Sequence, residues 1–294
     1  MVTAPEQLDL TNPLDRDAAL RAQMEQAVGS LAAQLSEGHT AEFLELLRFY
    51  SRFWTYSIRN CLLIQRQRPN ATRCAGRSLW NKMGYHIRKG EKAIWIWAPV
   101  LKKDTDPDTG EILTKVAGFR PAPVFDFAQL AESEERPLPA LVPHLPDDME
   151  QEYQRAVTKI ETTGIRVMHQ PLSGTTLGLS RPGQIAIATG LDSRNRLFVL
   201  LHELTHGLWH QQEDGPDPAR SREQAEFEAE SVAYVAAAVM GLDHPSARDY
   251  LLIWRATPEL LHRSLVAIQS MVRRVLLLLE IPFDVPHTSE ALIA

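Results

Sequence analysis

The residues best suited to chemistry lie in the stretch LFVLLHELTHGLWHQQ, which contains the pattern His202-Glu203-x-x-His206. On a helix, His202 and His206 are one turn apart on the same face, so both imidazoles can bind one zinc ion. Glu203 lies beside them and can serve as the general base toward a hydrolytic water. The pattern therefore predicts a zinc site of the hydrolytic type, with Glu203 as its catalytic residue.

A third protein ligand must come from elsewhere in the chain. The metzincin pattern H-E-x-x-H-x-x-G-x-x-H is excluded, because Trp209 and Gln212 occupy the places of its Gly and its third His. His210 does not fit that pattern. Together with Tyr234 and His244, it is a candidate only for stabilising a transition state.

Acidic side chains suited to the third position lie in a later predicted helix, REQAEFEAESVAYVAAAV. Glu230 opens the apolar half of this helix, so we expect it to point inward and prefer it as the third zinc ligand. Glu226 shares that face one turn earlier and is the alternative. We expect Glu223 and Glu228 to lie on the solvated face.

Charge is distributed unevenly along the chain. Between Arg48 and Lys103, thirteen Lys and Arg residues accompany a single acid, Glu91, whereas the whole chain has a net charge of −6. The remainder of the chain is therefore strongly acidic. This polarity predicts a basic module, of the kind that binds nucleic acid, joined to an acidic one.

Within the basic module, cations alternate with Trp and Tyr. Single-stranded nucleic acid is bound by this combination, since cations contact the phosphates and flat rings stack on the bases. Phe49, Phe53, Trp95 and Trp97 are expected to be core residues. The predicted DNA contacts are Arg52, Trp54, Tyr56, Arg59, Asn60, Trp80, Lys82, Tyr85, Arg88, Lys89 and Lys92.

The expected architecture is α+β in both halves. In the first half we expect helices over residues 15–38 and 40–67, followed by a β-hairpin formed by AIWIWAPV and KVAGFRPAPVFDF. AESEERPLPALVPHLPDD is Pro-rich and acidic, as linkers are. These features divide the chain into an amino-terminal domain (1–130), a linker (131–146) and a carboxy-terminal domain (147–294).

In the second half we expect a helix over residues 147–163 and a strand near residues 165–169. The strand GQIAIATG follows, and as an edge strand it could align an extended peptide beside the metal site. The helix of the metal motif comes next, with two or three further helices to about residue 280.

Several motifs resemble a known family. YSIRNCLLI, WNKMG with IRKGEKAI, and GFRPAPVFDF occur in this order and resemble the N-terminal domain of the ArdC antirestriction proteins. HELTHG with EFEAESVAYVAA resembles the metallopeptidase fold of the IrrE/ImmA type. The resemblance implies a single-stranded-DNA-binding domain followed by a zincin-like domain, with His202, His206 and Glu230 as metal ligands.

The resemblance, together with the metal motif and the basic module, leads us to expect an antirestriction protein of a mobile element, with single-stranded DNA as partner and Zn²⁺ as cofactor. One alternative is a DNA-recruited metalloprotease that cleaves a repressor or another DNA-bound protein. A second is a non-catalytic DNA-coating protein with a vestigial zinc site. Two isolated cysteines and the absence of a signal-peptide pattern favour the cytoplasm, and no apolar run is long enough to predict a membrane partner. The sequence sets no oligomeric state.

Overall fold

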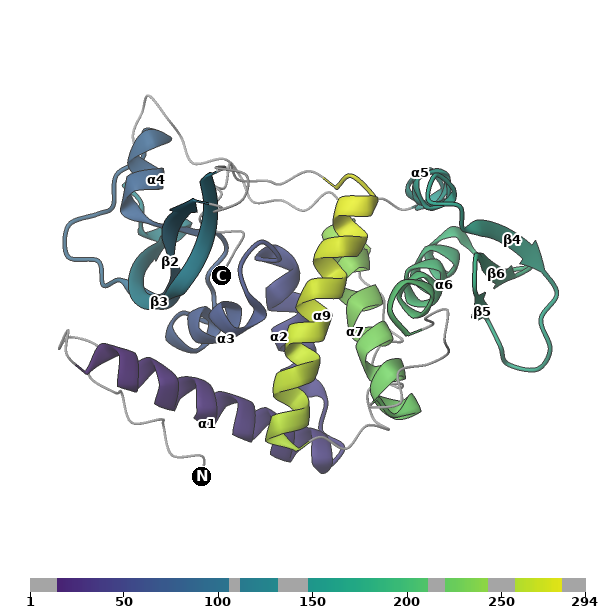
Figure 1. Cartoon of the computed structure of the whole chain (residues 1–294), viewed down its shortest axis with the longest axis horizontal. Coiled ribbons are helices and arrows are strands. Elements are labelled where there is room, and N and C mark those ends of the chain that lie inside the picture. Colours follow the sequence, from purple (N-terminus) through teal and green to yellow (C-terminus); the bar gives the residue numbers. More distant parts are fainter. Residues whose placement is uncertain (1–14, 106–111, 132–147, 211–219, 243–256, 282–294) are drawn as a thin grey trace. The chain divides into compact units, whose positions relative to one another are not determined.

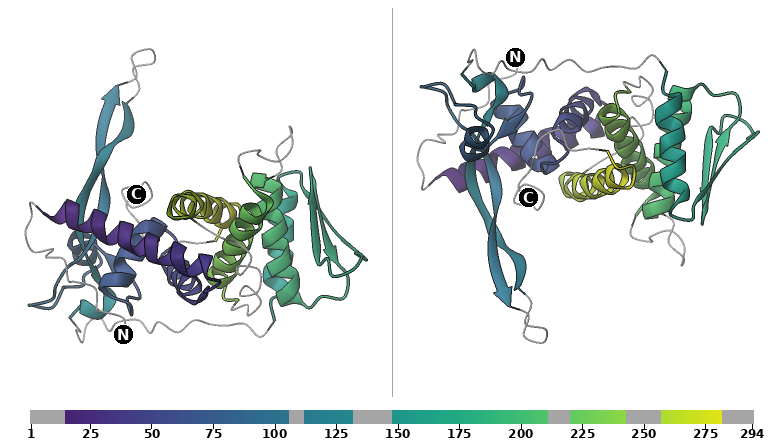
Figure 2. Two further views of the ribbon diagram at one scale, coloured as in Figure 1. Left: turned by 90° about the horizontal axis from the view of Figure 1, so that it is seen from below. Right: turned by 90° about the horizontal axis from the view of Figure 1, so that it is seen from above.

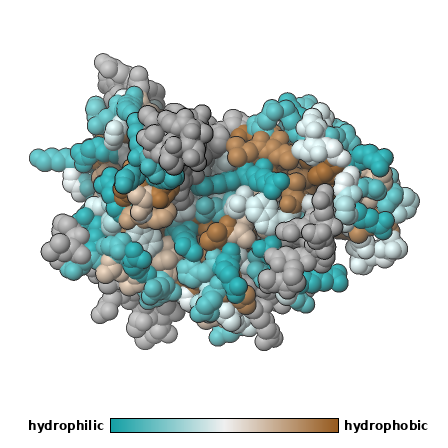
Figure 3. Space-filling model, in the orientation of Figure 1, coloured by the Kyte–Doolittle hydropathy of each residue, from teal (hydrophilic) through white to brown (hydrophobic). Residues whose placement is uncertain are grey.

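The computed structural model describes residues 15–105, 112–131, 148–210, 220–242 and 257–281 (Figure 1). Packing divides the chain into two units, one of residues 1–28, 55–141 and 283–294 and the other of residues 29–54 and 142–282. Both units contain helices and strands, so the predicted α+β class is confirmed. The face shown in Figure 3 is predominantly hydrophilic. None of the helices in the described ranges combines the length and the hydropathy needed to span a bilayer.

The first unit contains a three-stranded antiparallel sheet with the order β1-β3-β2. Its long strands, β2 (Ile94–Thr105) and β3 (Ile112–Asp126), pair as the predicted hairpin, and β1 (Cys74–Ala75) pairs with the end of β3. Figure 2 shows the two long strands twisting about each other and extending away from the helices of this unit. Those helices are α3 (Ile58–Gln67), α4 (Arg77–Lys82) and the first part of α1 (Arg16–Ser36).

The single helix predicted over residues 40–67 is two helices, which corrects that expectation. α2 (Ala41–Arg52) and α3 are separated by residues 53–57. Ser57 has an extended backbone, and its side chain accepts a hydrogen bond from the Asn60 N–H, as a helix N-cap does. α2 packs within the second unit, although the sequence analysis assigned its residues to the amino-terminal domain.

Two side-chain amides of α3 bind the outer edge of β2. The Asn60 amide donates to the carbonyl of Trp97 at 2.8 Å and accepts from its N–H at 3.0 Å. Gln67 makes the same pair of bonds to Trp95, at 2.8 and 2.9 Å. Both amides therefore replace a neighbouring strand and satisfy backbone groups that an edge strand would otherwise leave unpaired.

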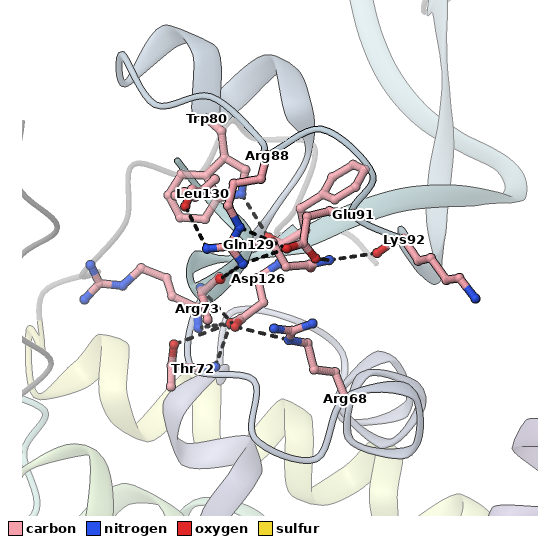
Figure 4. A network of polar contacts seen from close by, with 12 residues as sticks. Arg68, Thr72, Arg73, Trp80, Arg88, Glu91, Lys92, Asp126, Gln129 and Leu130 are labelled. Carbon is pink, nitrogen blue, oxygen red and sulfur yellow. Dashed lines mark hydrogen bonds and ion pairs between the residues drawn. The ribbon is translucent and has the colours of Figure 1, made fainter. Parts of the chain in front are cut away.

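The end of β3 is fixed by a buried carboxylate, which Figure 4 shows at the centre of a polar network. Asp126 is fully buried and accepts hydrogen bonds from the backbone N–H groups of Thr72 (2.8 Å), Arg73 (3.1 Å) and Ala128 (3.1 Å). Arg68 lies 3.5 Å from its second oxygen. These contacts join the loop before β1 to the turn after β3.

The same network holds the loop before β2. The Gln129 side chain accepts from the Asp126 N–H and donates to Glu91 and to the carbonyl of Lys92. Arg88 donates to Glu91 and to the carbonyls of Ala128 and Leu130 (Figure 4). Hydrogen bonds from Gln129 and Arg88 hold the pKa of Glu91 below its usual value.

The second unit contains a mixed three-stranded sheet with the order β4-β6-β5. β6 (Gln184–Ala188) is parallel to β4 (Arg166–Gln170) and antiparallel to β5 (Gly178–Arg181). β6, which we expected at the edge, is therefore the central strand. The expectation was wrong because the sequence did not predict β5. β5 occupies the edge and contacts the helix of the metal motif.

Besides α2 and the last part of α1, the described helices of this unit are those predicted, with one irregular turn added. They are α5 (Glu150–Glu161), α6 (Ser193–Thr205), the π-helical turn η2 (His206–His210), α7 (Arg222–Val239) and α9 (Pro258–Leu278). α7 is the central helix, since it packs on α6, α9 and α2. The rings of Phe43 on α2 and Phe227 on α7 have their centroids 4.9 Å apart.

Glu228 on α7 is fully buried, which corrects the expectation that it lies on a solvated face. One carboxylate oxygen accepts from Ser264 at 2.8 Å and from Gln224 at 2.9 Å, and the other lies 3.2 Å from the Arg220 Nε. This charge is therefore paired and hydrogen-bonded, as a buried charge must be, and it fixes α7 to α9.

Candidate metal centre

α6 carries the first two candidate ligands toward α7. It begins at Asp192, whose side chain accepts from the Asn195 N–H at 2.8 Å. Its apolar residues, including Leu197, Leu200 and Leu204, are fully buried. His202 lies in its last turn, and the π-helical turn begins at His206. Burial of the apolar side fixes the rotation of α6, so the helix holds both imidazoles on one face.

Glu226 is the carboxylate that meets both imidazoles. Its Oε2 atom lies 3.3 Å from Nε2 of His202 and 3.4 Å from Nε2 of His206, and the two Nε2 atoms are 3.0 Å apart. Zn–N and Zn–O bonds of about 2.0–2.1 Å place tetrahedral ligands about 3.3–3.4 Å apart. The three donor atoms therefore fit a single zinc-sized cation, and this is the one such group in the described part of the chain.

Glu230, the residue preferred from the sequence, lies on the other side of the His202 ring. Its Oε2 atom is 3.1 Å from Nδ1 of His202, and the residue is 2% exposed. A carboxylate in this place orients the imidazole and leaves its Nε2 atom available to a metal ion. The geometry thus brings the alternative, Glu226, to the donor cluster and gives Glu230 a supporting place behind it.

Two nearby carboxylates change the protonation of His202. Burial lowers its pKa, but hydrogen bonds to Glu226 and Glu230 outweigh burial and raise the pKa to about 10. Hydrogen bonds from His202 and His206 hold the pKa of Glu226 far below its usual value. The site therefore favours a positive charge between the imidazoles and the Glu226 carboxylate, which a proton or a metal cation can supply.

Glu203 lies against the edge strand β5. Burial raises the pKa of Glu203, although a hydrogen bond from the Ser180 backbone opposes this effect. The close approach depends on Gly178, because a Cβ atom there would lie 2.6 Å from both Cγ and Oε1 of Glu203. A carboxylate in this place, beside a cation site, has the position of a general base toward a water bound there.

Neither Gly178 nor Ser180 was predicted as part of the site. The available signal was Pro182-Gly183, a dipeptide typical of turns, which separates β5 from β6. Of the candidates for transition-state stabilisation, Tyr234 is buried. His244 and the side chain of His210 lie outside the described residues. Glu223 is exposed, as expected.

Three aromatic residues predicted as stacking platforms are buried. Trp54, Tyr56 and Trp80 are only 6%, 8% and 1% exposed. The Tyr56 hydroxyl donates to the Cys74 carbonyl, and the Trp80 indole donates to the Phe125 carbonyl. These rings fill the core and are not accessible to a base.

The polar DNA-contact candidates divide into two groups. Asn60 and Arg88 are engaged by the backbone contacts described above, and Arg59 and Tyr85 are partly buried. The exposed residues of the predicted set, besides Arg88, are Arg52, Lys82, Lys89 and Lys92. Trp95 and Trp97, expected in the core, are only partly buried.

Each half of the chain matches the model of a known protein family. Residues 18–125 match the family model for the N-terminal domain of anti-restriction factor ArdC, and residues 160–242 match that for the IrrE N-terminal-like domain. An uncharacterized Bacillus anthracis protein is 27% identical over 255 residues, which cover 72% of this chain and 43% of the relative. The chain thus spans less than half the length of this curated relative.

Two crystal structures have a similar fold. They are the metal-free and the Mn(II)-bound structures of the antirestriction ArdC protein from the R388 plasmid, with TM-scores of 0.54 and 0.52. Each match covers 87% of this chain and 97% of the other chain, at 15% sequence identity.

Proposed function

Because this chain joins an N-terminal domain of the ArdC anti-restriction type to an IrrE N-terminal-like domain, we propose that it protects the DNA of a mobile element from restriction. In this proposal the first domain binds single-stranded DNA, and the second is a zinc-dependent metallopeptidase. The protein would act in the cytoplasm, where its two buried cysteine thiols remain reduced.

One observation supports the metallopeptidase part of this proposal. Three donor atoms converge beside the carboxylate of Glu203, which is not one of the donors. His202, His206 and Glu226 would hold the metal through two Nε2 atoms and one Oε2 atom. Glu230 would orient His202 through Nδ1. A zinc ion bound there supplies Lewis acidity toward a carbonyl and lowers the pKa of a water.

Glu203 would accept the proton of the attacking water and later return it to the leaving amine. Its contact with β5 supports this role, because the Ser180 backbone holds the carboxylate in place. β5 is also an edge strand of its sheet, and an extended peptide could add to it in antiparallel fashion. The substrate class proposed is therefore an unfolded or extended polypeptide segment.

Substitution of the two carboxylates distinguishes a ligand from a supporting residue. Glu226→Gln should abolish stoichiometric zinc in the purified protein, whereas Glu230→Gln should weaken zinc binding by about 10–100-fold, as loss of a supporting contact does. Zinc content and competition with a chelator measure both. The reverse order, with Glu230→Gln the more damaging, would return the third position to Glu230.

Substitution of Glu203 tests whether hydrolysis contributes to protection. Glu203→Gln should retain zinc and lose hydrolysis of unfolded polypeptide. Transfer of a plasmid into a restricting host measures protection. Loss of protection in Glu203→Gln would indicate that cleavage is needed, and retained protection would favour a DNA-coating protein with a non-catalytic metal site.

A further inference from the structure

One face of the β2–β3 hairpin gathers aromatic and proline side chains. Trp95 pairs with Pro123, Trp97 with Pro121 and Pro99 with Phe119. Residues that are directly paired, or two apart on one strand, point to the same side of a sheet. These six residues therefore form one surface, the aromatic face, whereas Ile94, Ile96 and Val124 point to the buried side.

The aromatic face becomes more accessible along the hairpin. Arg16 of α1 stacks 3.6 Å above the Trp95 ring, and Arg21 lies 5.7 Å from the Trp97 ring. The Trp97 indole donates to Asp17 at 2.9 Å. Phe119 is 54% exposed and is the one exposed aromatic residue in the described ranges. The exposed Phe119 ring and the partly exposed Trp95 and Trp97 rings form a continuous apolar surface, and such surfaces mark interaction sites.

Cations flank this face. Arg16 lies at its base, and so does Arg21, which is paired with Asp17 at 2.8 Å. Lys103 is exposed and points to the same side as Trp97 and Pro99, because β2 alternates regularly and the irregularity of pairing falls at Ala117 on β3.

We infer that the aromatic face is a stacking surface for single-stranded nucleic acid. Phe119 stacks on one base, the exposed part of Trp97 contacts its neighbour, and Arg16 and Lys103 contact phosphates. Flat rings bordered by cations match the chemistry of an unpaired strand, whose bases expose both π-faces and whose backbone is anionic. This inference rests on the proposed DNA binding and replaces the buried Trp54, Tyr56 and Trp80 as platforms.

Fluorescence anisotropy with a labelled oligothymidylate tests the inference on the full-length protein. Phe119→Ala should weaken binding by about 5- to 150-fold, the range that corresponds to about 1–3 kcal/mol for one stacked base. Phe119→Trp should restore affinity. The matched control is Val100→Ala, since Val100 is 38% exposed but belongs to the opposite side of the same hairpin.

Two adjacent lysines, which point to opposite sides of β2, test which side of the hairpin contacts the phosphates. Lys103→Ala should reduce both the affinity and its dependence on salt, and Lys102→Ala, which removes the same charge from the other side, should do so less. An oligouridylate and a duplex of the same length distinguish DNA from RNA and single from double strands. Unchanged thermal unfolding would show that Phe119→Ala leaves the fold intact.

The outcomes separate the inference from the function on which it depends. If the wild-type protein binds no oligonucleotide, the proposed DNA binding itself fails. If the wild type binds single strands with salt-dependent affinity but Phe119→Ala and Val100→Ala are equivalent, only the assignment of this face is overturned. Equal effects of Lys102→Ala and Lys103→Ala would also argue against it.

Discussion

Replacing Gly178 by Ala should destabilise the second unit, because the added methyl group has no room. The new Cβ atom would lie 2.6 Å from Cγ and Oε1 of Glu203 and from Cγ1 of Val199. Carbon atoms in contact normally lie about 3.5–4.0 Å apart, so the neighbours must move by about 1 Å. Glu203 can rotate away, but Val199 is β-branched and confined to one rotamer on a helix.

Overpacking of this kind costs about 1–3 kcal/mol. For a unit of about 150–250 residues, such a loss lowers the melting temperature by about 2–4 °C per kcal/mol. Urea and thermal unfolding measure the change. Gly29→Ala is the matched control, since no atom lies within 4 Å of the added Cβ and Gly29 is inside α1, where Ala should stabilise by about 0.5–1 kcal/mol.

A double-mutant cycle connects this destabilisation to Glu203. Glu203→Ala removes two of the three close contacts, so Gly178→Ala should cost less in that background than in the wild type. Zinc content should be unchanged in Gly178→Ala, because the donor atoms lie on α6, η2 and α7. A Gly178→Ala protein as stable as the wild type, or additive effects in the cycle, would refute the account of β5 as the support of Glu203.

Three further substitutions test the first unit by urea unfolding. Asn60→Leu leaves the N–H and the carbonyl of Trp97 without their partner and should cost about 2 kcal/mol. It should also speed amide exchange at Trp97, and unchanged exchange would contradict the edge-binding role. Asp126→Ala removes the acceptor of three backbone donors and should reduce the free energy of unfolding by about 3 kcal/mol. This loss should exceed that caused by removing Glu91, the other carboxylate labelled in Figure 4. Ser57→Ala should cost about 1 kcal/mol by removing the cap of α3, and no loss would mean that packing alone starts this helix.

Much of the second unit could be predicted because its signals are local. Apolar periodicity gave α5, α6 and α7, and the HELTH spacing placed two imidazoles on one helical face. β5 was missed because four residues, Gly178–Arg181, carry no clear alternation of polarity. The break between α2 and α3 was missed because the apolar spacing continues through residues 53–57, although the backbone of these residues is not helical.

The aromatic residues of the basic module show a different limit. Trp80 and Tyr56 are followed or preceded by cations in the sequence, yet their rings are inside and their polar atoms bond backbone carbonyls. Sequence proximity to Arg or Lys does not show that an aromatic ring is exposed. A long cationic side chain can reach the solvent even when the ring beside it in the sequence is buried. The register of β2 and β3 was needed to identify Phe119 as the exposed ring.

The sequence by itself predicted a metal site and a chain of two domains. The prediction of a metal site rests on two histidines at helical spacing, a glutamate between them and a later acidic helix. Their interpretation uses local rules that hold in any fold. Only the tertiary structure gives a reason to propose Glu226 and not Glu230 as the third ligand. The two residues are one helical turn apart and have the same phase, so periodicity treats them alike. Only the way α7 packs on α6 brings Glu226 to the Nε2 atoms and Glu230 to Nδ1.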